Sequence, residues 1–135
     1  METKRVTSAP GAPAAVGPYS QAVVAGGFAF LAGQVPLDPE TGQVVGDSVA
    51  EQTERALENV KAVLASLGLD LGDVVRCVVY LTDVSKFQEM NGAYAAAFEP
   101  YCKSSGYPAR TTVEVSALPK GVKVEVEVTA VVPSG

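Results

Sequence analysis

Polar and apolar residues alternate through the last third of the chain, which is the pattern of β-strands with one buried face. The stretch 110–117 alternates in this way, and the next stretch repeats the pattern with four valines: Val122, Val124, Val126 and Val128. Between the two stretches, residues 118–121 (Leu-Pro-Lys-Gly) have the composition of a turn. We therefore expect a hairpin whose polar face carries Arg110 and Glu125, with Glu114 opposite Glu125 as a like-charge pair.

Three apolar segments earlier in the chain predict further strands. Residues 21–25 and 28–33 flank a Gly-Gly pair, and two glycines between apolar runs are typical of a hairpin. Residues 43–45 are expected to add a short strand. The run 74–81 is apolar on both of its faces, so it is predicted to be a central strand that is covered on both sides.

Helical spacing occurs in two segments. Ser48 and Glu51 have the S-x-x-E spacing of a capping box, and the helix that they start is expected to run to a glycine stop signal at position 68. A second helix is predicted to begin at Ser85, within an S-x-x-Q box, and to end at Pro100. Asn91 lies on the buried stripe of this helix, which consists of Phe87, Met90, Tyr94 and Phe98.

Together these elements predict an α+β fold, in which a mixed six-stranded sheet has two helices packed on one face. Right-handed crossover connections place both helices on the same side of the sheet. Two helices cover that side only, and the second face of the central strand, with Val74, Val78 and Tyr80, also needs burial. We therefore expect an oligomer in which the sheets of neighbouring copies cover one another.

The composition of the chain indicates the class of protein and excludes several kinds of site. The 135 residues are 47% hydrophobic and 19% charged, as expected for one folded domain, and no apolar run reaches the ~20 residues of a membrane span. The first residues lack the apolar run of a secretory signal, so we expect a cytoplasmic protein.

The absence of histidine excludes sites built on imidazole, and a net charge of −5 with scattered basic residues disfavours nucleic acid as a partner. Cys77 and Cys102 are too few for a disulfide framework or a four-cysteine metal site.

Guanidinium and carboxyl groups are the remaining candidates for chemistry. Arg110, fixed on a strand, suits bidentate capture of a small carboxylate, and a nearby Glu125 could move a proton to or from water. The alternative is a solvated strand face that carries ordinary charges. Asn91 is equally compatible with a structural hydrogen bond, and Tyr19, whose direction is fixed by Pro18, is more typical of packing than of catalysis.

Five motifs follow one another along the chain. They are Gly17-Pro18-Tyr19-Ser20-Gln21, Gly33-Gln34-Val35-Pro36-Leu37-Asp38, Glu51-Gln52-Thr53, Asn59 and Pro108-Ala109-Arg110-Thr111-Thr112-Val113-Glu114-Val115. Each motif is short, but the set in this order closely resembles the Rid family of reactive intermediate deaminases. The resemblance extends from about Ala14 to Val131 and implies a single domain over residues 1–135, in which residues 1–15 form an N-terminal arm.

The resemblance implies a chorismate mutase-like fold and a homotrimer whose sheets form a central barrel, with clefts between the subunits. It also implies hydrolytic deamination of reactive enamines and imines, such as 2-aminoacrylate, 2-iminopropanoate and 2-iminobutanoate, to 2-keto acids and ammonia. The archetype of the family uses neither a metal nor an organic cofactor. The absence of histidine and a second sheet face that needs burial agree with this picture.

Individual residues receive roles from the same resemblance. Arg110 would hold the substrate carboxylate, and Glu125 would position or activate water. The other implied contacts are Tyr19 of a neighbouring subunit, the backbone of Gly33, Asn91 as a support and backbone groups of Thr112. Ala32 and Thr112 stand where many members have Ser and some have Cys, so the preferred imine stays open.

Two other functions stay open for the same trimer. One is a noncatalytic module that binds small carboxylates or acts as a chaperone for client proteins. The other is a ribonuclease or translation inhibitor, which the net charge of −5 and the absence of histidine disfavour.

Overall fold

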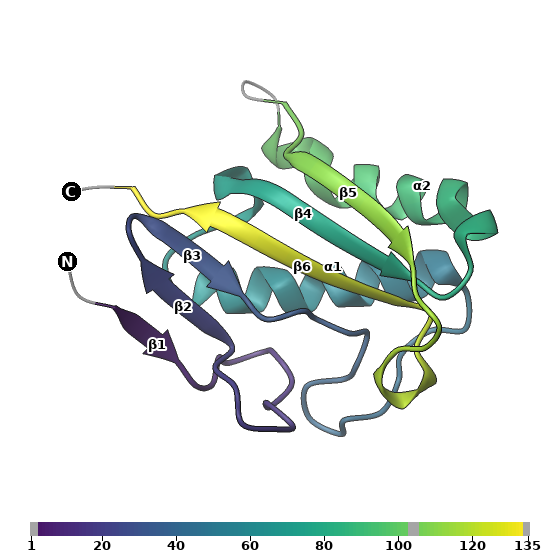
Figure 1. The fold of residues 1–135 in the computed structure, drawn as a ribbon, viewed down its shortest axis with the longest axis horizontal. Helices are drawn as coiled ribbons and strands as arrows, with labels where there is room; N and C mark the ends of the chain where they lie inside the picture. Colours follow the sequence, from purple (N-terminus) through teal and green to yellow (C-terminus); the bar gives the residue numbers. More distant parts are fainter. Residues whose placement is uncertain (1–2, 103–105, 134–135) are drawn as a thin grey trace.

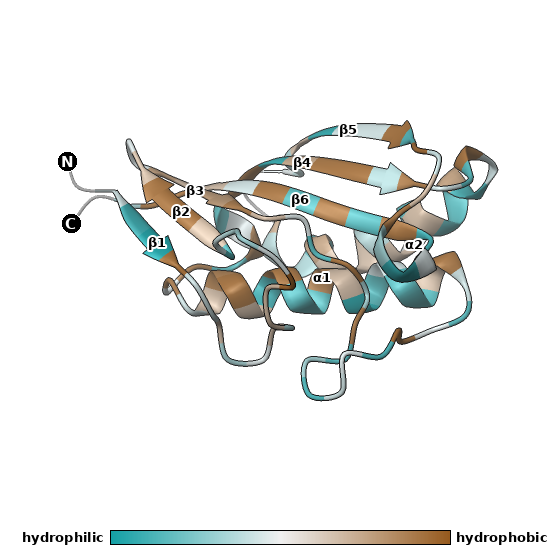
Figure 2. Ribbon diagram, turned by 60° about the horizontal axis from the view of Figure 1, so that its bottom comes forward, coloured by the Kyte–Doolittle hydropathy of each residue, from teal (hydrophilic) through white to brown (hydrophobic). Residues whose placement is uncertain are grey.

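The computed structural model describes residues 3–102 and 106–133, which form a mixed six-stranded sheet with two helices behind it (Figure 1). The strands are β1 (Lys4–Val6), β2 (Ala22–Ala25), β3 (Phe28–Leu31), β4 (Val74–Leu81), β5 (Ala109–Glu114) and β6 (Val124–Val131). They lie in the order β1-β2-β3-β6-β4-β5, and β4 and β5 run parallel. The helices α1 (Val49–Ala65) and α2 (Phe87–Phe98) pack on one face of the sheet (Figure 2), which confirms the fold class predicted for a single chain.

Helix α1 begins where its local sequence predicts. The Ser48 side chain accepts a hydrogen bond from the backbone N–H of Glu51, and the Glu51 carboxylate accepts one from the backbone N–H of Ser48, both at 3.1 Å. These bonds satisfy N–H groups that have no partner inside the helix. Gly68, with a φ of +73°, turns the chain away after the last helical turn.

Among the described residues, no helix has the length and apolar character that crossing a membrane requires.

The side of the sheet that faces the helices, called here the helix face, contains the core. Alternate residues of β6 point to this face and are buried: Val124, Val126, Val128 and Ala130. Cys77 of β4 pairs directly with Val128, so it lies on the same face, where it is fully buried. Figure 2 shows the same alternation as bands of hydropathy along β6. The predicted burial of the four valines is confirmed for the three of them that lie in β6, and Val122, which precedes the strand, is also buried.

The predicted hairpin between the last two strands is wrong. β5 and β6 lie on opposite edges of β4, which pairs with β5 in parallel and with β6 in antiparallel orientation. A buried central strand needs hydrogen-bond partners on both edges, and these two strands supply them. Because Glu114 pairs with Leu81 and Glu125 pairs with Tyr80, the expected Glu114–Glu125 pair does not form.

Three local predictions also differ from the structure. Helix α2 begins at Phe87 rather than at Ser85, because the Asp83 carboxylate accepts hydrogen bonds from the backbone N–H and the hydroxyl of Ser85 and caps a short 3-10 turn first. Residues 43–45 contribute an isolated bridge rather than a strand. The sixth strand is instead β1, which lies in the N-terminal arm and pairs with β2.

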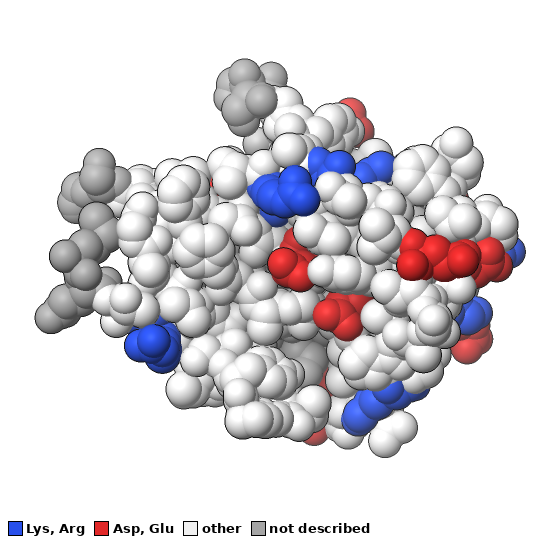
Figure 3. Space-filling model, in the orientation of Figure 1, with Lys and Arg blue, Asp and Glu red and all other residues white. Residues whose placement is uncertain are grey.

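The opposite side of the sheet, called here the open face, carries large apolar side chains that remain exposed in the single chain. Phe28 and Phe30 on β3 are 41% and 48% exposed, and Val113 on β5 and Val131 on β6 are each 38% exposed. Figure 3 views this face and shows charged side chains over its middle, with a largely uncharged area over β3. Exposed apolar area of this kind marks contact surfaces.

Asn59, a fully buried residue of α1, holds the loop that follows β3. Its Nδ2 donates hydrogen bonds to the carbonyl groups of Val35 and Leu37 at 2.9 and 3.0 Å, and its Oδ1 accepts one from Arg55 Nε at 3.1 Å. These bonds fix the path of the chain that leads away from Gly33.

Replacing Asn59 with alanine leaves two carbonyl groups without their side-chain donor. We expect Asn59→Ala to lower the free energy of unfolding by about 2–3 kcal/mol, measured by urea denaturation at a fixed protein concentration. Glu54→Ala, at an exposed position of the same helix, is the control and should change this free energy by less than ~0.5 kcal/mol. An Asn59→Ala loss no larger than that of the control would contradict the assignment.

Candidate functional site

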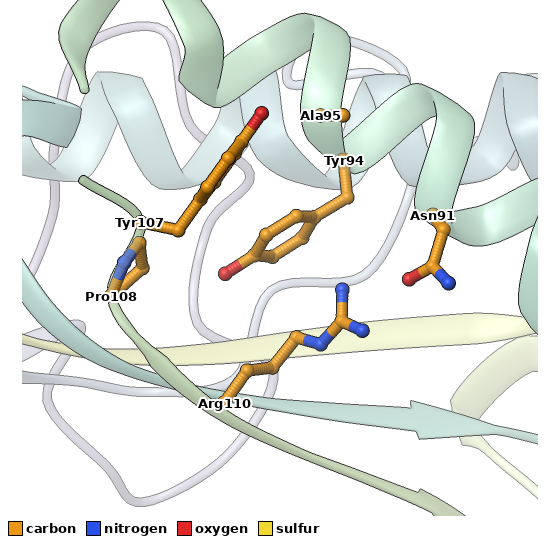
Figure 4. Close-up of a pocket in the computed structure, with 6 residues that line it drawn as sticks. All are labelled: Asn91, Tyr94, Ala95, Tyr107, Pro108 and Arg110. Carbon is orange, nitrogen blue, oxygen red and sulfur yellow. The ribbon is translucent and has the colours of Figure 1, made fainter. Parts of the chain in front are cut away.

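A cavity of about 460 Å³ lies between α2 and the chain that leads into β5. Its lining residues are Asn91, Tyr94 and Ala95 on α2, Tyr107 and Pro108 in the segment before β5, and Arg110 in β5 (Figure 4). The volume falls in the range of pockets that bind small molecules, ~300–1,000 Å³. Two tyrosine rings and one guanidinium give this cavity an apolar wall with a positive charge.

Arg110 reaches the cavity because of its register in the sheet. It pairs with Cys77, so its side chain leaves β5 on the helix face and points toward α2 (Figure 4). The guanidinium Cζ lies 4.7 Å from the centre of the Tyr94 ring and 5.4 Å from that of Phe87, and Nη1 lies 4.0 Å from the Met90 sulfur. Aromatic faces stabilise a cation and restrict its movement.

Arg110 forms no ion pair with any carboxylate in residues 3–102 and 106–133. A partly buried guanidinium without an internal anion offers two parallel N–H groups to an external carboxylate. This unpaired charge is the clearest feature of the cavity that points to a ligand.

Three buried polar atoms near Arg110 have no hydrogen-bond partner within the described part of the chain: Asn91 Oδ1, Tyr94 Oη and Thr112 Oγ1. Asn91 and Tyr94 line the cavity, and Thr112 lies two residues beyond Arg110 on the same face of β5. Buried polar atoms are satisfied in the great majority of cases, so a group of unsatisfied atoms indicates contacts that a ligand or a partner supplies.

The Cys77 thiol lies under this cavity but is not suited to act as a nucleophile. Burial raises the pKa of Cys77 to about 11, although the neighbouring Tyr94 hydroxyl and the Arg110 charge act in the opposite direction. Cys77 therefore serves as a small buried residue of the core.

A second cluster, on the open face, contains Glu125 and Gly33. The Glu125 carboxyl is half-buried, and burial raises its pKa, with a smaller contribution from the nearby charge of Glu127. Gly33 lies directly under this carboxyl: a Cβ at position 33 would approach Glu125 Cδ to 2.8 Å. Glycine at position 33 therefore makes room for the Glu125 side chain.

Arg110 and Glu125 lie on opposite faces of the sheet, which corrects the expectation that they share one face. Arg110 pairs with Cys77 on the helix face, whereas Glu125 pairs with Tyr80 on the open face. The expectation assumed a hairpin in which Val113 faces the core, but β5 is an edge strand and Val113 faces outward. Within one chain, the sheet separates the two groups.

The other candidate residues divide between these clusters. Asn91 and Thr112 accompany Arg110, and Gly33 accompanies Glu125, whereas Tyr19 belongs to neither. The Tyr19 ring is 46% exposed, and its hydroxyl accepts a hydrogen bond from the backbone N–H of Val16 at 3.3 Å. Sequence reasoning missed Tyr107 as part of the cavity wall, and no periodicity marks it, because it precedes β5 in an irregular segment.

Comparison with known proteins identifies the family. The family model described as Endoribonuclease L-PSP matches residues 9–132. The chain belongs to this family, which includes the Rid proteins. The resemblance to the Rid family that the five sequence motifs indicated is thus confirmed.

Relatives within the Rid family carry different names. A RutC family protein of Pyrococcus horikoshii is 46% identical, over 94% of this chain and 97% of its own length. A 2-iminobutanoate/2-iminopropanoate deaminase of Salmonella typhimurium is 45% identical, over 89% of this chain and 91% of its own length. Among solved structures, Escherichia coli TdcF with bound serine has a TM-score of 0.88 and 38% identity, covering 96% of this chain and 100% of that chain.

The contact between Gly33 and Glu125 can be tested directly. We expect Gly33→Ala to push the Glu125 carboxyl toward water, which relieves its burial and lowers its pKa toward the ordinary value. Carboxyl-carbon NMR titration measures this change. Gly92→Ala, on α2 where an added Cβ meets nothing within 4 Å, is the control and should leave the Glu125 titration unchanged. An unchanged Glu125 titration in Gly33→Ala would show that the two residues do not interact.

Proposed function

We propose that the protein hydrolyses the C=N bond of small 2-imino acids and their enamine tautomers, forming a 2-keto acid and ammonia. The observation that carries this proposal is the unpaired Arg110 guanidinium in a cavity with unsatisfied polar atoms. A relative at 45% identity is named 2-iminobutanoate/2-iminopropanoate deaminase, which supports imines of three- and four-carbon acids as substrates. We include 2-aminoacrylate and 2-iminopropanoate in the same class because they are tautomers.

Arg110 provides the clamp in this proposal. Its guanidinium binds the substrate carboxylate through two parallel hydrogen bonds, and Asn91 and the Thr112 segment bind the remaining polar atoms. A held substrate reacts with a held water as in an intramolecular reaction, which lowers the barrier by several kcal/mol. The platform of Tyr94 and Phe87 keeps the guanidinium in place before the substrate arrives.

Glu125 moves the protons. A carboxyl with a raised pKa holds its proton to a higher pH, so it can protonate the imine nitrogen. The carboxylate left behind then takes a proton from the attacking water. The water oxygen bonds to C2 and gives a tetrahedral intermediate with a hydroxyl and an amino group. Glu125 then gives its proton to the amino nitrogen, the hydroxyl proton passes back to the Glu125 carboxylate as the C=O bond forms, and the C2–N bond breaks to release ammonia. Water is the co-reactant, and side chains of the protein carry each proton.

The complete site requires more than one copy of the chain. The sheet separates Arg110 from Glu125, and Phe28, Phe30 and Val113 are exposed on the open face. We infer a homotrimer in which the open faces line a central barrel and the Arg110 cavity of one copy meets Glu125, Gly33 and Tyr19 of the next. Contacts between two different surfaces of identical chains close into a ring, and three copies form the smallest such ring beyond a pair.

A noncatalytic carboxylate-binding protein is the second candidate. The related TdcF structure holds serine, a small carboxylate that is not an imine. The same Arg110 clamp would serve such a binding protein. The family takes its name from an endoribonuclease, but a net charge of −5 and the absence of histidine disfavour the binding and acid–base cleavage of RNA.

Replacing Arg110 tests the enzyme directly. We expect Arg110→Ala to slow the protein-dependent loss of freshly generated 2-aminoacrylate and 2-iminopropanoate by about 100-fold or more, because the carboxylate loses its clamp. A dehydratase supplies the substrate, and released ammonia is measured.

Light scattering checks that the Arg110→Ala oligomer is intact, and Arg5→Ala, an exposed arginine of β1, is the matched control with an unchanged rate. An Arg110→Ala rate equal to that of the unaltered protein would remove Arg110 from the mechanism. Carboxylate binding without faster imine loss in the unaltered protein would support the noncatalytic alternative instead.

A further inference from the structure

Two polar side chains, those of Tyr80 and Glu127, lie beside Glu125 on the open face. Tyr80 on β4 pairs across the sheet with Glu125, yet its hydroxyl donates a hydrogen bond to Oε1 of Glu127, at 2.8 Å. Glu127 lies two residues beyond Glu125 on the same face of β6. One phenol therefore lies beside both carboxylates and donates to one of them.

Within the described residues, neither Glu125 nor Glu127 forms an ion pair with a cation. On β4, the Arg76 guanidinium donates to the Thr111 hydroxyl at 3.1 Å, and beyond the start of β6 the Lys123 ammonium donates to the carbonyl of Asp47. The neighbouring positions of the open face on β3 and β5, Phe30 and Val113, are uncharged, as is Gly33 beneath the carboxyl.

Two carboxylates on the same face of one strand repel each other when both are ionised, which favours the protonated form of the more buried one, Glu125. A hydrogen bond donated to a carboxylate stabilises its charged form. Because the Tyr80 hydroxyl donates to Glu127, the charge is stabilised there and the proton is left for Glu125. The direction of the Glu125 shift agrees: burial and the Glu127 charge both raise its pKa.

We propose that Tyr80 and Glu127 are positioning residues that favour a proton on Glu125. Neither residue needs to touch the substrate. The inference rests on the proposed function only where it gives this proton a use: protonation of the imine nitrogen. In the proposed trimer, Arg110 of the neighbouring copy favours an ionised Glu125, and the ionised Glu127 offsets that influence.

Carboxyl-carbon NMR titration of Glu125 tests the placement of the proton without any assay of activity. The probes are Tyr80→Phe, which keeps the ring and removes the donor, and Glu127→Gln, which keeps the shape and removes the charge. We expect the Glu125 midpoint to fall in both variants, by about half a pH unit or more in Glu127→Gln. Tyr101→Phe, which removes a tyrosine hydroxyl away from this cluster, is the control and leaves the midpoint unchanged.

The double variant decides whether Tyr80 acts through Glu127. If it does, the double variant titrates like Glu127→Gln alone, because the phenol then has no charge to stabilise. A Glu125 midpoint that stays in place in both single variants overturns the proposal, and so do two shifts that simply add in the double variant.

Activity provides a second readout that separates this inference from the proposed function. A protonated Glu125 is the active form, so activity is lost as the pH rises through its pKa, and the alkaline limb of the kcat profile should move to lower pH in both variants. Shifted NMR midpoints in a protein that does not accelerate imine loss would support the proton placement and contradict the proposed function. Unshifted NMR midpoints in a protein that does accelerate imine loss would contradict the proton placement and support the proposed function.

Discussion

The alternation of side chains across a pleated sheet keeps Arg110 and Glu125 apart within one chain. Arg110 lies in register with Cys77 and therefore points toward α2, whereas Glu125 lies in register with Tyr80 and points to the open face. No rotation of a side chain carries either group through the packed layer of Cys77 and Val79 between them. A reaction that uses both groups must take one from each of two copies.

The two faces of the sheet also differ in how far their side chains are buried. Two helices bury the side chains of β4 and β6 on one face of the sheet, and Asn59 fixes the loop that brings Gly33 under Glu125. The other face retains exposed aromatic and valine side chains, which association would bury. The unsatisfied atoms around Arg110 cost free energy in the isolated chain, as is common for groups that are organised in advance to bind a ligand.

Local patterns predicted the parts of the fold that depend on neighbouring residues. The capping box of Ser48 and Glu51, the valine face of β6 and the extent of β4 follow from spacing alone. The partner of a strand does not, because alternation specifies a face and not a neighbour, so β5 and β6 were expected to pair. Ser85 does not cap α2, because its backbone N–H and hydroxyl donate hydrogen bonds to the Asp83 carboxylate.

The same limit applies to the candidate site. Arg110 and Asn91 do line one cavity, with Thr112 two residues beyond Arg110 on the same strand face, and Gly33 and Glu125 meet elsewhere. The face on which a residue of an edge strand lies cannot be assigned without the register of that strand. The apolar side chain of Val113 is expected to face the core, but in the structure it is exposed. Spacing along α2 predicted that Phe87 and Tyr94 are buried. It could not predict that their rings contact Arg110, because spacing in a helix does not show which strand the helix packs against.

A mixing experiment tests most directly whether the site is shared between copies. Arg110→Ala and Glu125→Gln are each expected to be inactive, and they are co-assembled in equal amounts by joint refolding. If every site takes Arg110 from one copy and Glu125 from the next, random assembly leaves one adjacent pair in four intact and restores about a quarter of the activity of the unaltered protein. A mixture that stays as inactive as its two components would contradict the shared site.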